Sequence, residues 1–290
     1  MSVAGYGALL DALRGLSWPA RRASRGATSG THVSRLRGTS AEFTEYRAYR
    51  QGDDPRRLDW KLLARTDKAF LRITNERAVM PTLFVLDASA SMAFPADTRE
   101  KWAQACRLVV GLSAVAHSAA DPVGIIVPGA PRRALPLRAR GGVVGEIARL
   151  VDGVMPAGDA PLAPIVRESS RAARLVIVTD LLGDAPGLLR AVREQATRGI
   201  DCVLLHVVAR AELDPPVGAV LAEDPERAEV RRALVGSTRE GYLVAFDAWR
   251  TEQARAWRAS GARYMDVVDD EVAERAIRRV VGNARHEERA

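Results

Sequence analysis

From residue 82 to the C-terminus, short apolar runs alternate with longer segments in which apolar residues recur every three or four positions. The short runs predict buried β-strands, and the longer segments predict helices with one apolar face. Such alternation is typical of an α/β fold in which helices cover both faces of a mostly parallel sheet. The predicted strands span 82–87, 123–128, 133–137, 174–180, 201–208 and 262–268. The predicted helices span 98–118, 143–154, 162–173, 186–198, 241–260 and 271–281.

The second and third predicted strands are joined by a turn at Gly129, Ala130 and Pro131, which is too short for a crossover helix. The third strand must therefore run antiparallel to the second, at an edge of the sheet. We expect a doubly wound, mostly parallel six-stranded sheet of the Rossmann-like kind. Residues 210–239 are rich in proline and charge and fit no element clearly.

The first 80 residues lack this periodicity. We interpret residues 1–30 as a flexible or helical lead, residues 31–80 as a loop-rich N-terminal extension folded against the sheet, and residues 81–290 as the α/β domain. No apolar run reaches the roughly 18 residues of a membrane span, and the first residues lack the basic region of a signal peptide. We therefore expect a cytoplasmic protein.

The net charge of +7 is confined to the first 80 residues, which hold 15 Lys+Arg against 8 Asp+Glu, whereas the rest of the chain holds 28 of each. The acidic residues are interleaved with the arginines, and aromatic residues are too few for a base-stacking platform. This distribution disfavours nucleic acid as a partner. Binding of an anionic polymer or a membrane surface through the arginine-rich extension is kept as an alternative function. Cys106 and Cys202 are too few for a sulfur-based metal site.

A cluster of oxygen-bearing side chains is predicted at one edge of the sheet. Asp87, Ser89 and Ser91 follow the first strand directly, and Asp180 ends the fourth. If these strands are neighbours, their carboxyl ends meet at the switch point where such sheets bind ligands. An all-oxygen set suits a hard cation such as Mg²⁺ or Mn²⁺. The alternative is that Asp87, Ser91 and Asp180 only cap the helices that follow.

Two features carry a family resemblance. Asp87-x-Ser89-x-Ser91 resembles the metal-ion-dependent adhesion site (MIDAS) of von Willebrand factor A-like (vWA) domains. The stretch from Glu42 to Tyr49 and the block GDDPR, LDW and AR within residues 52–65 are similar to the bacterial domain-of-unknown-function-58 family, in which this block precedes a vWA-like fold.

The resemblance implies a vWA-like, Mg²⁺-dependent protein-interaction domain without enzymatic activity. It further implies an adaptor or assembly role with a MoxR-type AAA+ ATPase in the maturation of protein complexes. An acidic side chain of a protein partner would complete the metal site. In vWA domains a threonine from a second loop contributes as well, but here Asp159 stands in its place. A third carboxylate could tighten cation binding, or the site could be degenerate and hold no metal.

The extension supplies a candidate partner-docking surface. The same stretch would also suit a tight turn held by local ion pairs, with Trp60 buried as an anchor. The candidate docking residues are Asp53, Asp54, Arg56, Asp59, Trp60 and Arg65.

A metal-dependent phosphohydrolase is the second alternative, with Asp87 as the residue that would accept a phosphoryl group. The familiar version of that chemistry has a second aspartate two residues later, where this chain has Ser89. No phosphate-binding glycine loop or HExxH motif occurs, which disfavours an enzyme. The oligomeric state is left open.

Overall fold

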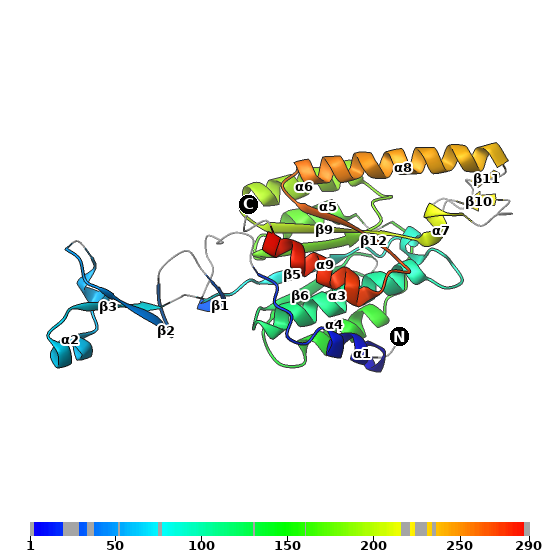
Figure 1. Ribbon diagram of the computed structural model, residues 1–290. Coiled ribbons are helices and arrows are strands. Elements are labelled where there is room, and N and C mark those ends of the chain that lie inside the picture. The colour runs from blue at the N-terminus through cyan, green and yellow to red at the C-terminus, as the bar shows by residue number, and fades with distance from the viewer. Residues whose placement is uncertain are drawn as a thin grey trace.

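The computed structural model of the chain (Figure 1) describes residues 3–19, 29–33, 38–51, 53–74, 77–129, 131–159, 161–215, 221–223, 231–233 and 236–286. Its centre is a six-stranded sheet in the order β12-β9-β8-β5-β6-β7. Every pairing in this sheet is parallel except that of β7 with β6, so the predicted antiparallel edge strand is confirmed. The strands are β5 (Thr82–Leu86), β6 (Val123–Val127), β7 (Arg133–Arg138), β8 (Arg174–Thr179), β9 (Asp201–Val208) and β12 (Arg263–Val268).

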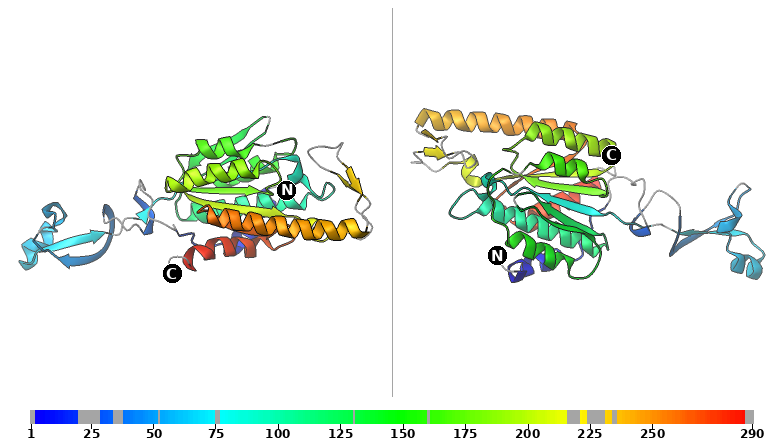
Figure 2. Two further views of the ribbon diagram at one scale, coloured as in Figure 1. Left: turned by 90° about the horizontal axis from the view of Figure 1, so that it is seen from above. Right: turned by 180° about the vertical axis from the view of Figure 1, so that it is seen from behind.

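Helices cover both faces of the sheet, as the alternating pattern predicts (Figures 1 and 2). On β5, Phe84 and Leu86 join one core cluster while Leu83 and Val85 join the other, because successive side chains point to opposite faces. The first cluster is covered by α1 (Gly7–Ala12), α3 (Glu100–Ser118), α4 (Val143–Asp152) and α9 (Ala273–His286). The second is covered by α5 (Leu162–Glu168), α6 (Ala185–Thr197) and α8 (Gly236–Ala259). The doubly wound α/β fold is therefore confirmed.

The close approach of β7 to β6 depends on Gly124. A Cβ atom added there would lie 2.8 Å from the carbonyl oxygen of Leu135 and from the amide nitrogen of Leu137. Only glycine avoids this backbone clash, so the residue allows the edge strand to pair.

The first residues of the chain pack on the α/β unit. A 3₁₀ turn, η1 (Val3–Tyr6), leads into α1, and Tyr6, Leu13 and Trp18 are buried in the first core cluster. The guanidinium of Arg174, at the start of β8, lies 4.1 Å from the Trp18 ring centroid and donates to the carbonyl oxygens of Trp18 and Pro19. Burial together with this cation–π contact ties the described lead to the start of the sheet.

The extension contains regular structure of its own. It comprises β1 (Ser29–Val33), β2 (Gly38–Ala48), η2 (Pro55–Arg57), α2 (Trp60–Thr66), β3 (Phe70–Thr74) and β4 (Arg77–Ala78). β2 pairs with β3 and β1 with β4, both antiparallel. In Figures 1 and 2, β2, α2 and β3 project away from the α/β unit rather than packing against its sheet, and the chain returns through β4 to the start of β5.

The remaining elements lie around the carboxyl ends of the strands. They are η3 (Ala90–Ala93), α7 (Arg210–Leu213), β10 (Leu221–Glu223) and β11 (Arg231–Ala233), of which the last three fall in the segment that fitted no element clearly. Among the described residues, no helix combines the length and the apolar character needed to cross a bilayer.

Candidate metal centre

The loop after β5 turns back tightly on itself. The Asp87 N–H donates to the Val178 carbonyl at 2.9 Å, which extends the β5–β8 ladder by one residue. Oδ1 of Asp87 then accepts a 2.9 Å bond from the Ser89 N–H. The hydroxyls of Ser89 and Ser91 lie 3.0 Å apart. All three side chains are buried, so this loop gathers one carboxylate and two hydroxyls in a small space.

The end of β8 supplies the opposite side of the site. Thr179 donates its hydroxyl to Oδ2 of Asp87 at 2.6 Å and accepts from the Leu181 N–H at 3.0 Å. Asp180 is buried beside it, with Oδ1 accepting from the Leu182 N–H at 3.2 Å. The expectation that the ends of these two strands lie side by side is confirmed, because β5 and β8 are neighbours in the sheet. Thr179 was missed, although a hydroxyl interrupting an apolar strand just before an aspartate was a usable signal.

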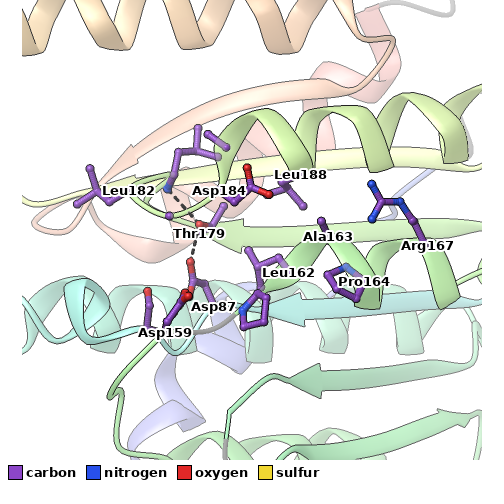
Figure 3. A pocket seen from close by; sticks show the side chains of 15 residues that line it. Asp87, Asp159, Leu162, Ala163, Pro164, Arg167, Thr179, Leu182, Asp184 and Leu188 are labelled. Atoms are coloured by element: carbon purple, nitrogen blue, oxygen red, sulfur yellow. Dashed lines mark hydrogen bonds between the residues drawn. The ribbon is translucent and has the colours of Figure 1, made fainter. Parts of the chain in front are cut away.

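A second loop closes on the first through two backbone hydrogen bonds. The Ala157 N–H donates to the Ala88 carbonyl and the Ala90 N–H donates to the Gly158 carbonyl, both at 2.9 Å. This pairing places the exposed Asp159 on the same cleft as Asp87 (Figure 3). The structure therefore brings all five predicted metal-site residues to one region.

A buried lysine that the sequence reasoning missed lies next to Asp180. Lys101, from α3, is fully buried, and its Nζ lies 3.0 Å from Oδ2 of Asp180 and 2.6 Å from Oε1 of Glu212. The other oxygen of Glu212 accepts from the Ala209 N–H at 2.7 Å. Burial alone would lower the pKa of Lys101, but the charges of Asp180 and Glu212 outweigh it and raise the pKa. Lys101 is thus a built-in cation that neutralises part of the site.

The surroundings of Asp87 disfavour the ionised form of its carboxylate. Burial and the charge of Asp180 together raise the pKa of Asp87 to about 6, against the opposing effect of the hydrogen bonds from Thr179 and Ser89. The ionised carboxylate is therefore costly in the protein alone. A cation between these oxygens would relieve that cost.

The donor set fits a hard cation held with several waters. The described residues include no group of three or more His, Cys, Asp or Glu side chains arranged to hold a metal ion. A cation here would rely on one or two carboxylates together with hydroxyls and water. Mg²⁺ accepts such a set because it keeps much of its hydration shell.

The helix-capping alternative is wrong for the helices it named. Asp184, not Asp180, caps α6 by accepting from the Gly187 N–H at 2.9 Å. α3 begins after Arg99 and has no side-chain cap. The backbone N–H that donates to the Asp87 carboxylate belongs to Ser89, in the same loop. Capping of α3 therefore does not explain why Asp87 is buried.

The aspartates of the extension stabilise its turns. Asp53 accepts from the Arg47 guanidinium at 2.6 Å, and this hydrogen bond lowers the pKa of Asp53. Asp54 accepts from the Arg56 N–H and caps η2, while Asp59 accepts from two backbone N–H groups and caps α2.

The expectation that Trp60 is buried as an anchor is wrong, because its side chain is 63% exposed. None of the residues of α2 is buried. Arg56 and Arg65 are exposed as well. The extension joins the sheet before β5, whereas Asp87 follows β5, so the predicted docking residues and the metal-site residues belong to opposite ends of that strand.

A cleft of about 470 Å³ opens from the metal-site oxygens between α5 and α6. Figure 3 shows Asp87, Asp159 and Thr179 toward one end and Arg167 at the other, and Asp184 also lines the cleft beside Leu188. Ser89 also lines it, while Ser91 and Asp180 are buried next to it.

Comparison with known proteins places the chain in a family. The model of the family described as "Protein of unknown function DUF58" matches residues 45–253. A relative from Mycobacterium tuberculosis, "Uncharacterized protein Rv1480", is 27% identical over 283 residues, covering 90% of this chain and 85% of that protein. Among solved structures, BatB from Bacteroides thetaiotaomicron has a TM-score of 0.47 and 18% identity, covering 71% of this chain and 98% of that one.

The mussel-byssus protein PTMP1, described "with zinc occupied MIDAS motif", has a TM-score of 0.42 and 14% identity, covering 70% of this chain and 47% of that one. The family match spans well over half of the present sequence. This chain belongs to the DUF58 family.

Proposed function

We propose that the chain is a metal-dependent protein-binding domain that acts as an adaptor without catalysing a reaction. The observation that carries the proposal is the buried meeting of Asp87, Ser89 and Ser91 with Thr179 and Asp180 at the ends of β5 and β8. Such an arrangement offers hard oxygen ligands and leaves negative charge uncompensated at Asp87. A purely structural role for the loop would not require that charge.

In this proposal Asp87, Ser89 and Ser91 hold Mg²⁺ or Mn²⁺ directly, and Asp180 and Asp159 add negative charge around it. A bound Mg²⁺ would supply a positive centre with an open coordination position for a carboxylate of a protein partner. Lys101 already neutralises Asp180 in part. This limits the attraction of the site for a free cation, so the partner's carboxylate is expected to strengthen metal binding.

The partner that we propose is a MoxR-type AAA+ ATPase, reached through the extension in the cytoplasm. The exposed Trp60, with the exposed cations Arg56, Lys61 and Arg65 near it in the sequence, supports a docking role for α2 and the turn before it. Exposed tryptophan and arginine side chains are the residue types most often found at the centres of protein interfaces.

Calorimetric titration with Mn²⁺ and Mg²⁺ tests the proposed site. We expect a saturable heat for the wild-type chain and none for Asp87→Asn, because asparagine keeps the size of the side chain but removes its charge. Asp214→Asn is the matched control, since Asp214 is an exposed aspartate paired with Arg239 away from the cleft. Equal heats for the wild type and Asp87→Asn would refute the proposal.

Metal binding should also depend on pH in a defined window. The cation competes with a proton for Asp87, whose pKa is raised to about 6. The apparent affinity for Mn²⁺ should therefore fall as the pH is lowered from 7 through 6 to 5, by about tenfold per unit below 6, and should level off above about pH 7. Titrations in a series of buffers check this, and an affinity independent of pH between 5 and 7 would show that Asp87 is not a ligand.

A further inference from the structure

Four charged side chains are gathered at the metal centre. Asp87 and Asp180 are buried, and Lys101 joins Asp180 to a third carboxylate, Glu212, through contacts of 3.0 Å and 2.6 Å. Three carboxylates against one ammonium leave two negative charges, the amount that one Mg²⁺ or Mn²⁺ ion neutralises. His206, on the neighbouring strand β9, adds no charge at neutral pH, because burial lowers its pKa to about 4. Without Glu212 the same group would hold only half of the negative charge.

The Lys101 ammonium is shared between two carboxylates. It lies closer to Oε1 of Glu212 than to Oδ2 of Asp180. Both oxygens of Glu212 accept hydrogen bonds, one from Lys101 and the other from the Ala209 N–H at 2.7 Å, which favours the ionised form of this carboxylate. Charges buried in this way are screened little by salt and water. Glu212 therefore offsets the positive charge of Lys101 and leaves the charge of Asp180 available to a cation.

The surroundings of α7 fix the position of Glu212. α7 begins one residue after the carboxyl end of β9 (Figure 1). The first N–H of this helix, that of Arg210, donates to Asp269 at 2.8 Å, and the Arg210 guanidinium pairs with Asp270. On α8, Tyr242 donates its hydroxyl to the Glu212 carbonyl at 3.0 Å. The Glu212 carboxylate is thus held in place before any cation binds.

We propose that Glu212 is a positioning residue that sets the affinity of the metal centre for its cation, by drawing the Lys101 ammonium toward itself and away from Asp180. This role rests on the metal site proposed above. If the Glu212 carboxylate is removed, Lys101 pairs with Asp180 alone, and its positive charge opposes the cation at full strength. The loss of the negative charge of Glu212 acts in the same direction.

Calorimetric titration with Mn²⁺ measures the effect. Glu212→Gln keeps the size of the side chain and removes its charge, and it should weaken Mn²⁺ binding by about tenfold or more. Glu146→Gln is the matched control, because Glu146 is also paired with a cation, Arg140 at 2.6 Å. Glu146 lies in the first turn of α4, which follows the end of the antiparallel strand β7 and so starts at the opposite edge of the sheet from Asp87. This control should bind Mn²⁺ as the wild type does.

Two further variants separate an effect through Lys101 from the effect of the charge of Glu212 itself. Glu212→Asp keeps the charge but withdraws the carboxylate from Lys101 by one methylene group, and should weaken Mn²⁺ binding severalfold. In a chain that carries Lys101→Met, Glu212→Gln should weaken binding much less than it does in the wild type, because no ammonium remains to be redistributed. Unchanged affinity in Glu212→Asp, or an equal loss with and without Lys101, would overturn the proposal.

The outcomes distinguish the role of Glu212 from the metal site on which it rests. If the wild type binds Mn²⁺ through Asp87 and Glu212→Gln binds it equally well, the role of Glu212 is overturned while the metal site stands. If the wild type gives no heat, the metal site is overturned, and the role of Glu212 with it. Circular dichroism verifies the fold of each variant before titration. If Lys101→Met does not fold, the comparison of Glu212→Asp with the wild type decides.

Discussion

Replacing Lys101 by methionine is expected to lower the free energy of unfolding by about 3–5 kcal/mol, the usual range for removing one partner from a buried ion pair. Methionine preserves much of the unbranched apolar stem, so the change deletes the ammonium and little else. Asp180 and Glu212 then remain as carboxylates in the protein interior without their shared cation. Leaving a buried charge unpaired costs far more than the pair itself contributes.

Urea unfolding followed by circular dichroism at neutral pH measures this loss. Lys61→Met, at an exposed lysine of α2, is the control and should change stability by no more than about 0.5 kcal/mol. The double variant Lys101→Met with Glu212→Gln should recover part of the loss, because one of the two unpaired charges is gone. A loss of less than about 1 kcal/mol for Lys101→Met would contradict the assignment of Lys101 as the internal cation.

Asp87→Asn is expected to stabilise the chain in the absence of metal and to leave it less stable than the wild type in the presence of Mg²⁺. The pKa of Asp87 is raised in the folded chain from its ordinary 3.8 to about 6, so the folded state holds this proton more tightly than the unfolded state. Stability therefore falls as the pH rises from about 4 to about 6, and above pH 6 the ionised carboxylate is a net cost. Asparagine removes that cost, and the metal-free variant should be more stable than the wild type at pH 7.5.

Magnesium should reverse this order. At a concentration one hundred times its Kd, Mg²⁺ should stabilise the wild type by about 2.7 kcal/mol and the variant not at all. Chemical unfolding at pH 7.5 with EDTA or with Mg²⁺ measures both effects, and Asp214→Asn should behave as the wild type does. An equal increment from Mg²⁺ in the wild type and Asp87→Asn would place the bound cation elsewhere.

The sheet could be predicted because its strands carry strong local signals. TLFVL and RLVIVT each contain four consecutive apolar residues, buried on both faces of a parallel sheet, and such runs differ plainly from the helical segments between them. The short turn predicted the antiparallel edge strand, and the strand that ends in Asp180 was expected beside the first strand if that strand is central, whereas the full strand order was not predicted. Asp87 and Asp180 could be found because strand ends and switch points position side chains independently of packing detail.

The residues that were missed depend on contacts between distant parts of the chain. Lys101 stands near the start of a helix, where a lysine is ordinarily exposed, and its partner Glu212 lies 111 residues later in a segment with no clear pattern. Trp18 is buried in a core cluster, and the Arg174 guanidinium donates to its carbonyl across 156 positions of sequence. The exposure of Trp60 was missed for the converse reason, since a large aromatic residue suggests burial wherever no tertiary contact is known.

Crystals grown with Mn²⁺ and measured at an X-ray wavelength where manganese scatters anomalously test the metal centre most directly. The proposal predicts one anomalous peak within coordination distance, about 2–2.3 Å, of the Asp87 carboxylate and the hydroxyls of Ser89 and Ser91, and no such peak in Asp87→Asn. An empty site in the wild type at a Mn²⁺ concentration that saturates the calorimetric titration, or a peak bound only to other residues, would contradict it.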